Sequence, residues 1–196
     1  MTTTPTLAER KRQLVAGELA QAALELLARK GFDAVTVDEI AAAAGVSKRT
    51  FFRYFASKED VIVRLLAEMG ADMRTELAAR PPEEPPSVAL RHAVSVSVTA
   101  CTGHADQALQ VVRLILGTPA LHARFLERQA QWREELAAEL AARTGQPAGS
   151  LHPRLAAGTA LAAFDVILQQ WSTGTEDPAE LTARAFAAIA PALDAR

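Results

Sequence analysis

A pair of short helices joined by a tight turn is encoded near the start of the chain, and it constrains the fold more than any other feature. Thr36 and Glu39 have the Thr-x-x-Glu spacing of a capping box, in which the two residues satisfy each other's backbone amides at a helix start. Gly45 then interrupts the helical pattern, and Ser47 is placed to cap a second helix. The pattern predicts a helix-turn-helix arrangement, with helices at about 37–44 and 47–55.

The rest of the chain also has the patterns of helices. Alanine is abundant, alternation of β-branched residues is nearly absent, and glycine and proline recur at intervals that end helices. Val15, Leu19 and Leu26 share one apolar face of the first helix, which Gly31 ends. We therefore predict an all-α fold of about nine helices, the others at 8–29, 58–79, 87–102, 105–116, 119–143, 153–173 and 178–193.

Four prolines lie within the seven residues 80–86, RPPEEPP. Proline lacks the amide hydrogen that a helix interior needs, so this segment cannot be helix interior. We interpret it as a stiff, exposed link into the larger helical region.

The charge is unevenly distributed along the chain, although the formal net charge is only −2. Residues 1–58 hold nine Lys and Arg against six Asp and Glu, and the remainder holds twelve against seventeen. A basic segment followed by an acidic one is typical of a phosphate-binding module joined to a second part.

The second short helix has two different faces. Phe51 and Phe55 are four residues apart, so they lie on one face and are predicted to enter the core. Lys48 and Arg49 occupy the first turn, where long donors suit guanine O6 and N7. We predict that this surface binds double-stranded DNA, and the candidate residues are Thr36, Ser47, Lys48, Arg49, Thr50, Phe52, Arg53, Tyr54 and Lys58.

The segment TVDEIAAAAGVSKRTFFRYFASKED, residues 36–60, resembles the amino-terminal domain of the TetR family of bacterial transcriptional regulators. The family pattern is roughly T-x-x-x-I-A-x-x-A-G-V-S-x-x-T-[L/F]-Y-x-[H/Y]-F-x-[S/N]-K-E. The resemblance implies that Thr50, Tyr54 and Lys58 contact phosphates, and that Lys48 and Arg49 read bases. It also places Thr36 at a capping position near backbone phosphate, and Ser47 at the next cap. Phe52 stands where the family usually has tyrosine, so one hydroxyl that could reach DNA is missing.

The resemblance further implies a helix-turn-helix DNA-binding domain over 1–57 and a helical ligand-binding and dimerisation domain over 58–196. The implied protein is a homodimeric repressor that binds a palindromic operator and is released by a small, largely apolar effector of unknown identity. An activator of the same fold, or a helical adaptor whose helix-turn-helix binds protein, remains an alternative.

Two sets of residues are candidates for effector binding and dimerisation. Small and apolar residues near the end of the chain would let two helices pack against a second copy, through Leu161, Phe164, Leu168, Trp171, Phe186 and Ile189. A mostly apolar cavity between the helices would carry a few polar groups, and the candidates are His92, Cys101, His104, Arg113, Gln129, Trp132 and Gln169.

An enzyme is the main rival class. No Glu-x-x-His pair marks a di-iron bundle, and no glycine-rich phosphate loop is present. The single cysteine excludes an internal disulfide. No secretory signal and no apolar run of about 18 residues is found. We therefore expect a cytoplasmic protein that is not an enzyme, with no cofactor, metal or membrane partner.

Overall fold

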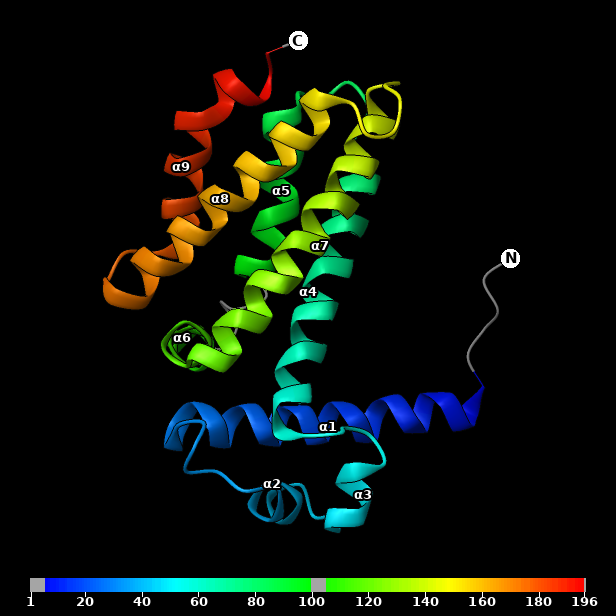
Figure 1. Cartoon of the computed structure of the whole chain (residues 1–196), viewed down its shortest axis with the longest axis vertical. Helices are drawn as coiled ribbons and strands as arrows, with labels where there is room; N and C mark the ends of the chain where they lie inside the picture. The colour runs from blue at the N-terminus through cyan, green and yellow to red at the C-terminus, as the bar shows by residue number, and fades with distance from the viewer. Residues whose placement is uncertain (1–5, 100–104, 196) are drawn as a thin grey trace. The chain divides into compact units, whose positions relative to one another are not determined.

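The computed structural model describes residues 6–99 and 105–195, and in these residues it is built from α-helices without strands (Figure 1). The all-α prediction is confirmed, and the observed helices begin and end close to the predicted limits. They are α1 (Leu7–Lys30), α2 (Val37–Ala43), α3 (Lys48–Phe52), α4 (Lys58–Ala79), α5 (Pro86–Thr99), α6 (Ala105–Gly117), α7 (Pro119–Arg143), α8 (Leu151–Thr173) and α9 (Pro178–Leu193).

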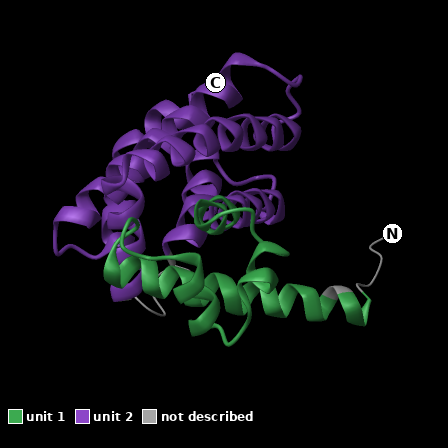
Figure 2. Ribbon diagram, turned by 60° about the horizontal axis from the view of Figure 1, so that its bottom comes forward, with its two compact units in different colours: residues 1–64 green, residues 65–196 purple. Residues whose placement is uncertain are grey.

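The chain forms two compact units, Met1–Arg64 and Leu65–Arg196 (Figure 2). The division lies within α4, slightly later than the expected limit at residue 57. Val61 and Ile62 in the early turns of this helix are fully buried. Helix α4 is therefore the continuous element that runs from one unit into the other.

The core of the first unit forms where α2 and α3 meet α1. Phe51 and Phe55 are buried as predicted, with ring centroids 5.5 Å apart, and Ile40 is fully buried as well. Between α2 and α3, Gly45 has a φ of 65°, a left-handed conformation that glycine adopts without a steric penalty. The turn closes through a hydrogen bond from Val46 N to Ala41 O of 2.9 Å.

The second unit is centred on α8, which packs against α5, α6, α7 and α9. Trp132 of α7 is buried between Phe125 and Phe164, with ring centroids 6.0 and 6.5 Å away. Helix α8 is long and apolar enough to cross a membrane by length and composition alone, but the core helix of a soluble protein passes the same test. Its position inside the bundle explains why it is apolar.

The predicted dimer stripe belongs to this core. Leu161, Phe164, Leu168, Trp171 and Phe186 are between 0 and 7% exposed within the single chain, and Ile189 is half-buried. Side chains that their own protomer already covers offer almost no surface to a partner. Assigning these five residues to a dimer interface was therefore wrong, because periodicity reveals an apolar face but not which neighbour covers it.

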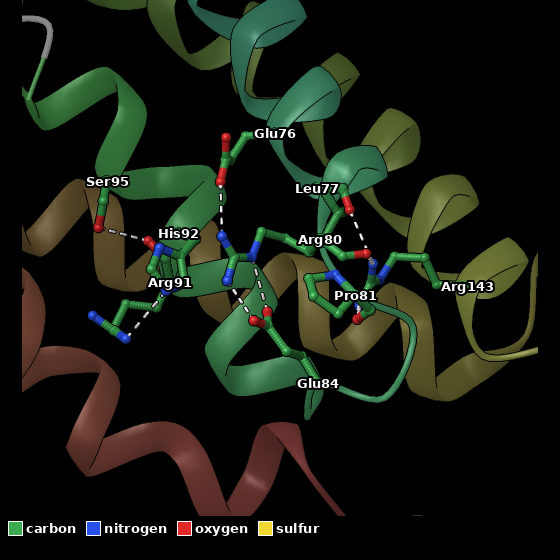
Figure 3. Close-up of polar contacts among 9 residues, drawn as sticks. All are labelled: Glu76, Leu77, Arg80, Pro81, Glu84, Arg91, His92, Ser95 and Arg143. Carbon is green, nitrogen blue, oxygen red and sulfur yellow. Dashed lines mark hydrogen bonds and ion pairs between the residues drawn. The ribbon is translucent and has the colours of Figure 1, made fainter.

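The proline segment is held between α4 and α5 by charged side chains (Figure 3). Arg80 bonds to Glu84 and also to Glu76, and the bonds from Arg80 lower the pKa of the Glu84 carboxyl. The guanidinium of Arg143, at the end of α7, donates to the carbonyls of Leu77, Arg80 and Pro81. We call this group the Arg143 clamp, and it gives a charged donor to carbonyl groups at the end of α4 and just after it.

Candidate nucleic-acid interface and ligand groove

The capping box at the start of α2 is present as predicted. Glu39 N donates to Thr36 Oγ1 over 3.2 Å, and Thr36 N donates to Glu39 Oε2 over 2.9 Å. Lys30 Nζ, at the end of α1, lies 2.7 Å from Glu39 Oε1. The ammonium of Lys30, followed by the amide and hydroxyl of Thr36, lowers the pKa of Glu39 to about 2.

This shift makes the stability of the first unit depend on pH. The folded-state pKa of Glu39 is about 2 against 4.5 for the unperturbed group, so ionised Glu39 favours folding above pH 4.5, and the contribution is lost as pH falls toward 2. We expect the stability difference between the wild type and Glu39→Gln to be largest at neutral pH and to shrink below pH 4.5. Urea unfolding at pH 7, 5, 4 and 3 measures it, with Glu18→Gln on the exposed surface of α1 as control. If the stability difference between the wild type and Glu39→Gln stayed constant from pH 7 to pH 3, the lowered pKa of Glu39 would be contradicted.

Helix α3 presents the predicted basic surface. Ser47 caps it by accepting from Thr50 N over 3.2 Å, and its hydroxyl also lies 3.0 Å from Thr50 Oγ1. The helix ends at Phe52 rather than at residue 55, and a turn follows it. The side chains of four residues that share one face of this segment are exposed, namely Lys48, Arg49, Phe52 and Arg53.

Arg53 and Tyr54 lie together at the end of this surface. The Arg53 guanidinium lies 5.1 Å from the centre of the Tyr54 ring, and its Nη2 is 3.4 Å from the tyrosine hydroxyl. Thr50 and Tyr54 are half-buried. The structure thus brings the predicted DNA-binding residues of α3 and the following turn onto one side of the first unit.

Lys58 is placed differently from the prediction. Its ammonium donates to the carbonyls of Phe32 and Val35 over 2.7 and 3.1 Å, and it lies 4.3 Å from the centre of the Phe32 ring. Two of its three donors are therefore used inside the unit. These two bonds fasten the loop between α1 and α2, and the third donor leaves the phosphate contact of Lys58 as a prediction.

A groove with a volume of about 550 Å³ lies between α4 and α7 in the second unit. Among the predicted ligand residues with a described position, Trp132 alone lines it. Sequence reasoning missed Arg128, Glu135 and Glu139, although their helical spacing along α7 places them on the same face as Trp132. The lining consists of Ala67, Ala71, Arg74, Arg128, Trp132, Glu135, Ala138 and Glu139.

Two donors at this groove lack acceptors. Arg128 Nε and Trp132 Nε1 are buried, and neither finds a hydrogen-bond partner among the residues that the structure describes. An unpaired buried N–H is costly, so a ligand that brings an acceptor to Arg128 would be favoured here, whereas Trp132 Nε1 lies against Gly70 of α4. In the described part of the chain, no three His, Cys, Asp or Glu side chains gather as metal ligands.

The other predicted ligand residues that the structure describes lie outside this groove. Arg113 is exposed and donates to Ser172 O over 2.8 Å, which ties α6 to the end of α8. Gln169 is exposed and donates to Asp165 on its own helix. Neither side chain lines the groove, because both have structural partners away from it, and their part in ligand binding stays a prediction. His92 and Gln129 are half-buried outside its lining, and Cys101 and His104 fall outside the described residues.

The indole of Trp132 packs directly against Gly70 of α4. A Cβ atom at Gly70 would lie 2.0 Å from Trp132 Nε1 and 2.3 Å from its Cδ1, so the indole depends on glycine in α4. We expect Gly70→Ala to lower the free energy of unfolding by about 2 kcal/mol, because overpacking costs more than the roughly 1 kcal/mol that alanine adds to helix propensity. Thermal unfolding measures this, with Gly158→Ala as control.

The control replaces a glycine within α8 whose nearest contact to an added Cβ would be 3.5 Å. Gly158→Ala should therefore be neutral or stabilising by up to about 1 kcal/mol. Equal effects of the two substitutions would show that the close approach of α4 to Trp132 contributes nothing.

Family models and known proteins match both units. Residues 19–65 match the model of bacterial regulatory proteins of the tetR family, and residues 84–194 match the MftR C-terminal domain. The chain is 32% identical over 193 residues to the HTH-type transcriptional regulator TcmR of Streptomyces glaucescens, covering 93% of this chain and 84% of that protein. It is also 32% identical over 198 residues to MftR of Mycobacterium tuberculosis, described as a mycofactocin biosynthesis transcriptional regulator, covering 94% of each.

Solved structures share the fold. The regulator FadR from Bacillus subtilis, in complex with stearoyl-CoA, is 19% identical with a TM-score of 0.68, over 90% of this chain and 98% of that one. Thermus thermophilus FadR, described as a TetR family transcriptional repressor in complex with lauroyl-CoA, is 26% identical with a TM-score of 0.55. That match covers 92% of this chain and 96% of the FadR chain.

Proposed function

Because this chain belongs to the TetR family of bacterial transcriptional regulators, we propose that it represses transcription in the cytoplasm by binding a palindromic operator as a dimer. The observation that carries this proposal is the exposed basic surface of α3, built on the buried Phe51 and Phe55. Lys48 and Arg49 in the first turn of α3 donate to base edges, while Thr50, Arg53 and Tyr54 contact phosphates.

A second copy of the chain covers the outward faces of α8 and α9. Leu155 and Val166 on α8 are 58 and 51% exposed. Ala183, Ala187 and Ala188 on α9 are exposed and small, so a partner helix could approach closely. A two-fold pairing through these faces buries apolar surface that the single chain leaves in water. Two recognition helices roughly 34–36 Å apart would then match the two halves of a palindrome.

The effector binds in the groove between α4 and α7. Alanine side chains and Trp132 supply apolar surface, while the unpaired donor of Arg128 favours a ligand that carries acceptor oxygens. Fatty acyl thioesters fit this description, and the two FadR structures are complexes with such ligands. Because α4 continues into the DNA-binding unit, a ligand that prefers one position of this helix shifts the population of DNA-binding dimers. About 1.4 kcal/mol of such coupling weakens operator binding tenfold.

Fluorescence anisotropy with DNA from upstream of the protein's own gene tests DNA binding. We expect binding that weakens steeply with salt, with a slope of about 0.9 per phosphate contact on logarithmic axes. Lys48→Ala should weaken binding to this DNA by roughly tenfold while changing binding to random duplex much less. Equally weak binding to both DNAs would contradict the proposal and favour the adaptor alternative. Transcription from a reporter separates repressor from activator.

Titration of the DNA complex with lauroyl-CoA tests the effector site, with coenzyme A alone as the control ligand. We expect the thioester to weaken operator binding by about tenfold or more. Arg128→Met should remove this response without changing DNA affinity. Arg124→Met is the matched control, because Arg124 is exposed on α7 and lies outside the groove lining. An operator affinity that does not change when lauroyl-CoA is added would exclude fatty acyl thioesters as the effector.

A further inference from the structure

The lysine in the first turn of α3 is already paired. Lys48 Nζ donates to Asp38 Oδ2 over 2.8 Å, and the two side chains are 55 and 65% exposed. Asp38 lies in the first turn of α2 and Lys48 in the first turn of α3. The pair therefore bridges the two helices of the helix-turn-helix on the surface of the first unit.

The stability of α2 explains this carboxylate only in small part, because an exposed carboxylate in the first helical turn contributes about 0.3–1 kcal/mol through the helix dipole. Glu39, the neighbour of Asp38, forms the capping box with Thr36 and the ion pair with Lys30. An ion pair as exposed as Asp38 and Lys48 contributes little to folding. A carboxylate on a DNA-facing surface also repels phosphates, so its presence weakens general binding to DNA.

We propose that Asp38 is a specificity-determining residue that, together with Lys48, reads a single G·C base pair. This inference rests on the proposed function, namely that α3 enters the major groove. An ammonium has three donors, so Lys48 can keep its bond to Asp38 and still donate to guanine O6 and N7. The carboxylate accepts from the N4 amino group of cytosine, as aspartate does in direct readout.

The two charges also reject the other base pairs. At an A·T pair, the adenine N6 amino group faces the ammonium where guanine O6 would accept, and thymine O4 faces the carboxylate with no proton to give. Reversing G·C to C·G places the ammonium of Lys48 against the cytosine amino group and the carboxylate of Asp38 against the acceptors of guanine. Discrimination therefore comes from repulsion as well as attraction. Without Asp38, Lys48 would favour guanine but would make no contact with the cytosine paired to it.

The test is selection of bound duplexes from a random pool with the full chain, followed by sequencing. The variants are Asp38→Asn, Lys48→Ala and the double substitution, with Asp33→Asn as control because Asp33 is an exposed carboxylate between α1 and α2. We expect Asp38→Asn to lower the preference for G·C at one position of each half-site by about tenfold. Lys48→Ala should act at the same position, and the double variant should lose no more than Lys48→Ala alone.

The outcomes separate this inference from the proposed function. A uniform change in affinity with an unaltered base preference would overturn the reading of G·C by Asp38, and so would losses at different positions for the two single variants. A wild-type protein that enriches no sequence would overturn the proposed function itself, and this inference with it. Thermal melting confirms that each variant is folded, and Asp38→Ala replaces Asp38→Asn if that variant is not.

Discussion

Replacing Phe51 with alanine is expected to unfold most of the DNA-binding unit. The side chain is fully buried beside Phe55, and truncating a buried phenylalanine typically costs about 3–5 kcal/mol. A unit of this size has a total stability of roughly 3–10 kcal/mol, so the loss is comparable with everything that keeps it folded. Hydrogen exchange measured by mass spectrometry should show lost protection over residues 37–55, while the core of α8 stays protected.

Phe52→Ala is the matched control. Phe52 follows Phe51 in the chain but is 48% exposed, and its ring contacts Phe51 edge-on at 5.6 Å between centroids. Losing this contact should cost about 1 kcal/mol or less. Phe52→Ala should therefore remain folded and report only on DNA contact. Wild-type protection in Phe51→Ala would refute the view that this ring holds α2 and α3 together.

Replacing Arg143 with methionine is expected to destabilise the second unit by about 2–3 kcal/mol. The carbonyls of Leu77, Arg80 and Pro81 would lose their charged donor. A single hydrogen bond to a charged group contributes about 1.5–3 kcal/mol, and the three bonds of one guanidinium are not additive. Partial exposure of the clamp lets water replace some of the loss. Urea unfolding followed by the fluorescence of Trp132 and Trp171 measures the change.

Arg143→Lys tests the geometry of the clamp. Lysine keeps the charge, but a single ammonium does not reproduce the planar fork that reaches three carbonyls. We expect it to recover less than half of the lost stability. Arg154→Met, on the exposed surface of α8, should change stability by about 0.5 kcal/mol or less. A full recovery by lysine would mean that charge alone accounts for the effect.

The helix-turn-helix could be predicted from sequence because its signals are local. The capping box of Thr36 and Glu39, the glycine at position 45 and the cap at Ser47 each act within four residues, and the structure contains all three. The pairing of Phe51 with Phe55 also follows from helical spacing. The length of α3 was overestimated, because after Phe52 the amides of Arg53 and Tyr54 bond to carbonyls three residues back and only Phe55 N keeps a bond four residues back, to Phe51 O.

Roles that depend on distant partners could not be predicted. Lys58 reaches back to carbonyls 23 and 26 residues earlier, and Arg113 meets a carbonyl 59 residues later. Sequence shows that such residues are charged, but not which backbone group will face them. The charged residues that line the groove were missed for the same reason, because Arg74 and Arg128 come together only when α4 and α7 pack.

The hydrogen bonds of Asp194 have a consequence for how the protein is made. Its carboxylate accepts from the amide and hydroxyl of Ser87 over 2.8 and 2.7 Å, across 107 residues of chain, and so it caps the start of α5. During synthesis this cap is missing until residue 194 has left the ribosome. The first unit needs no such delay, since Lys58 fastens it across 26 residues. The first unit of a nascent chain can therefore fold before the second unit is complete. Chaperones that bind during synthesis would meet the second unit while α5 still lacks its cap.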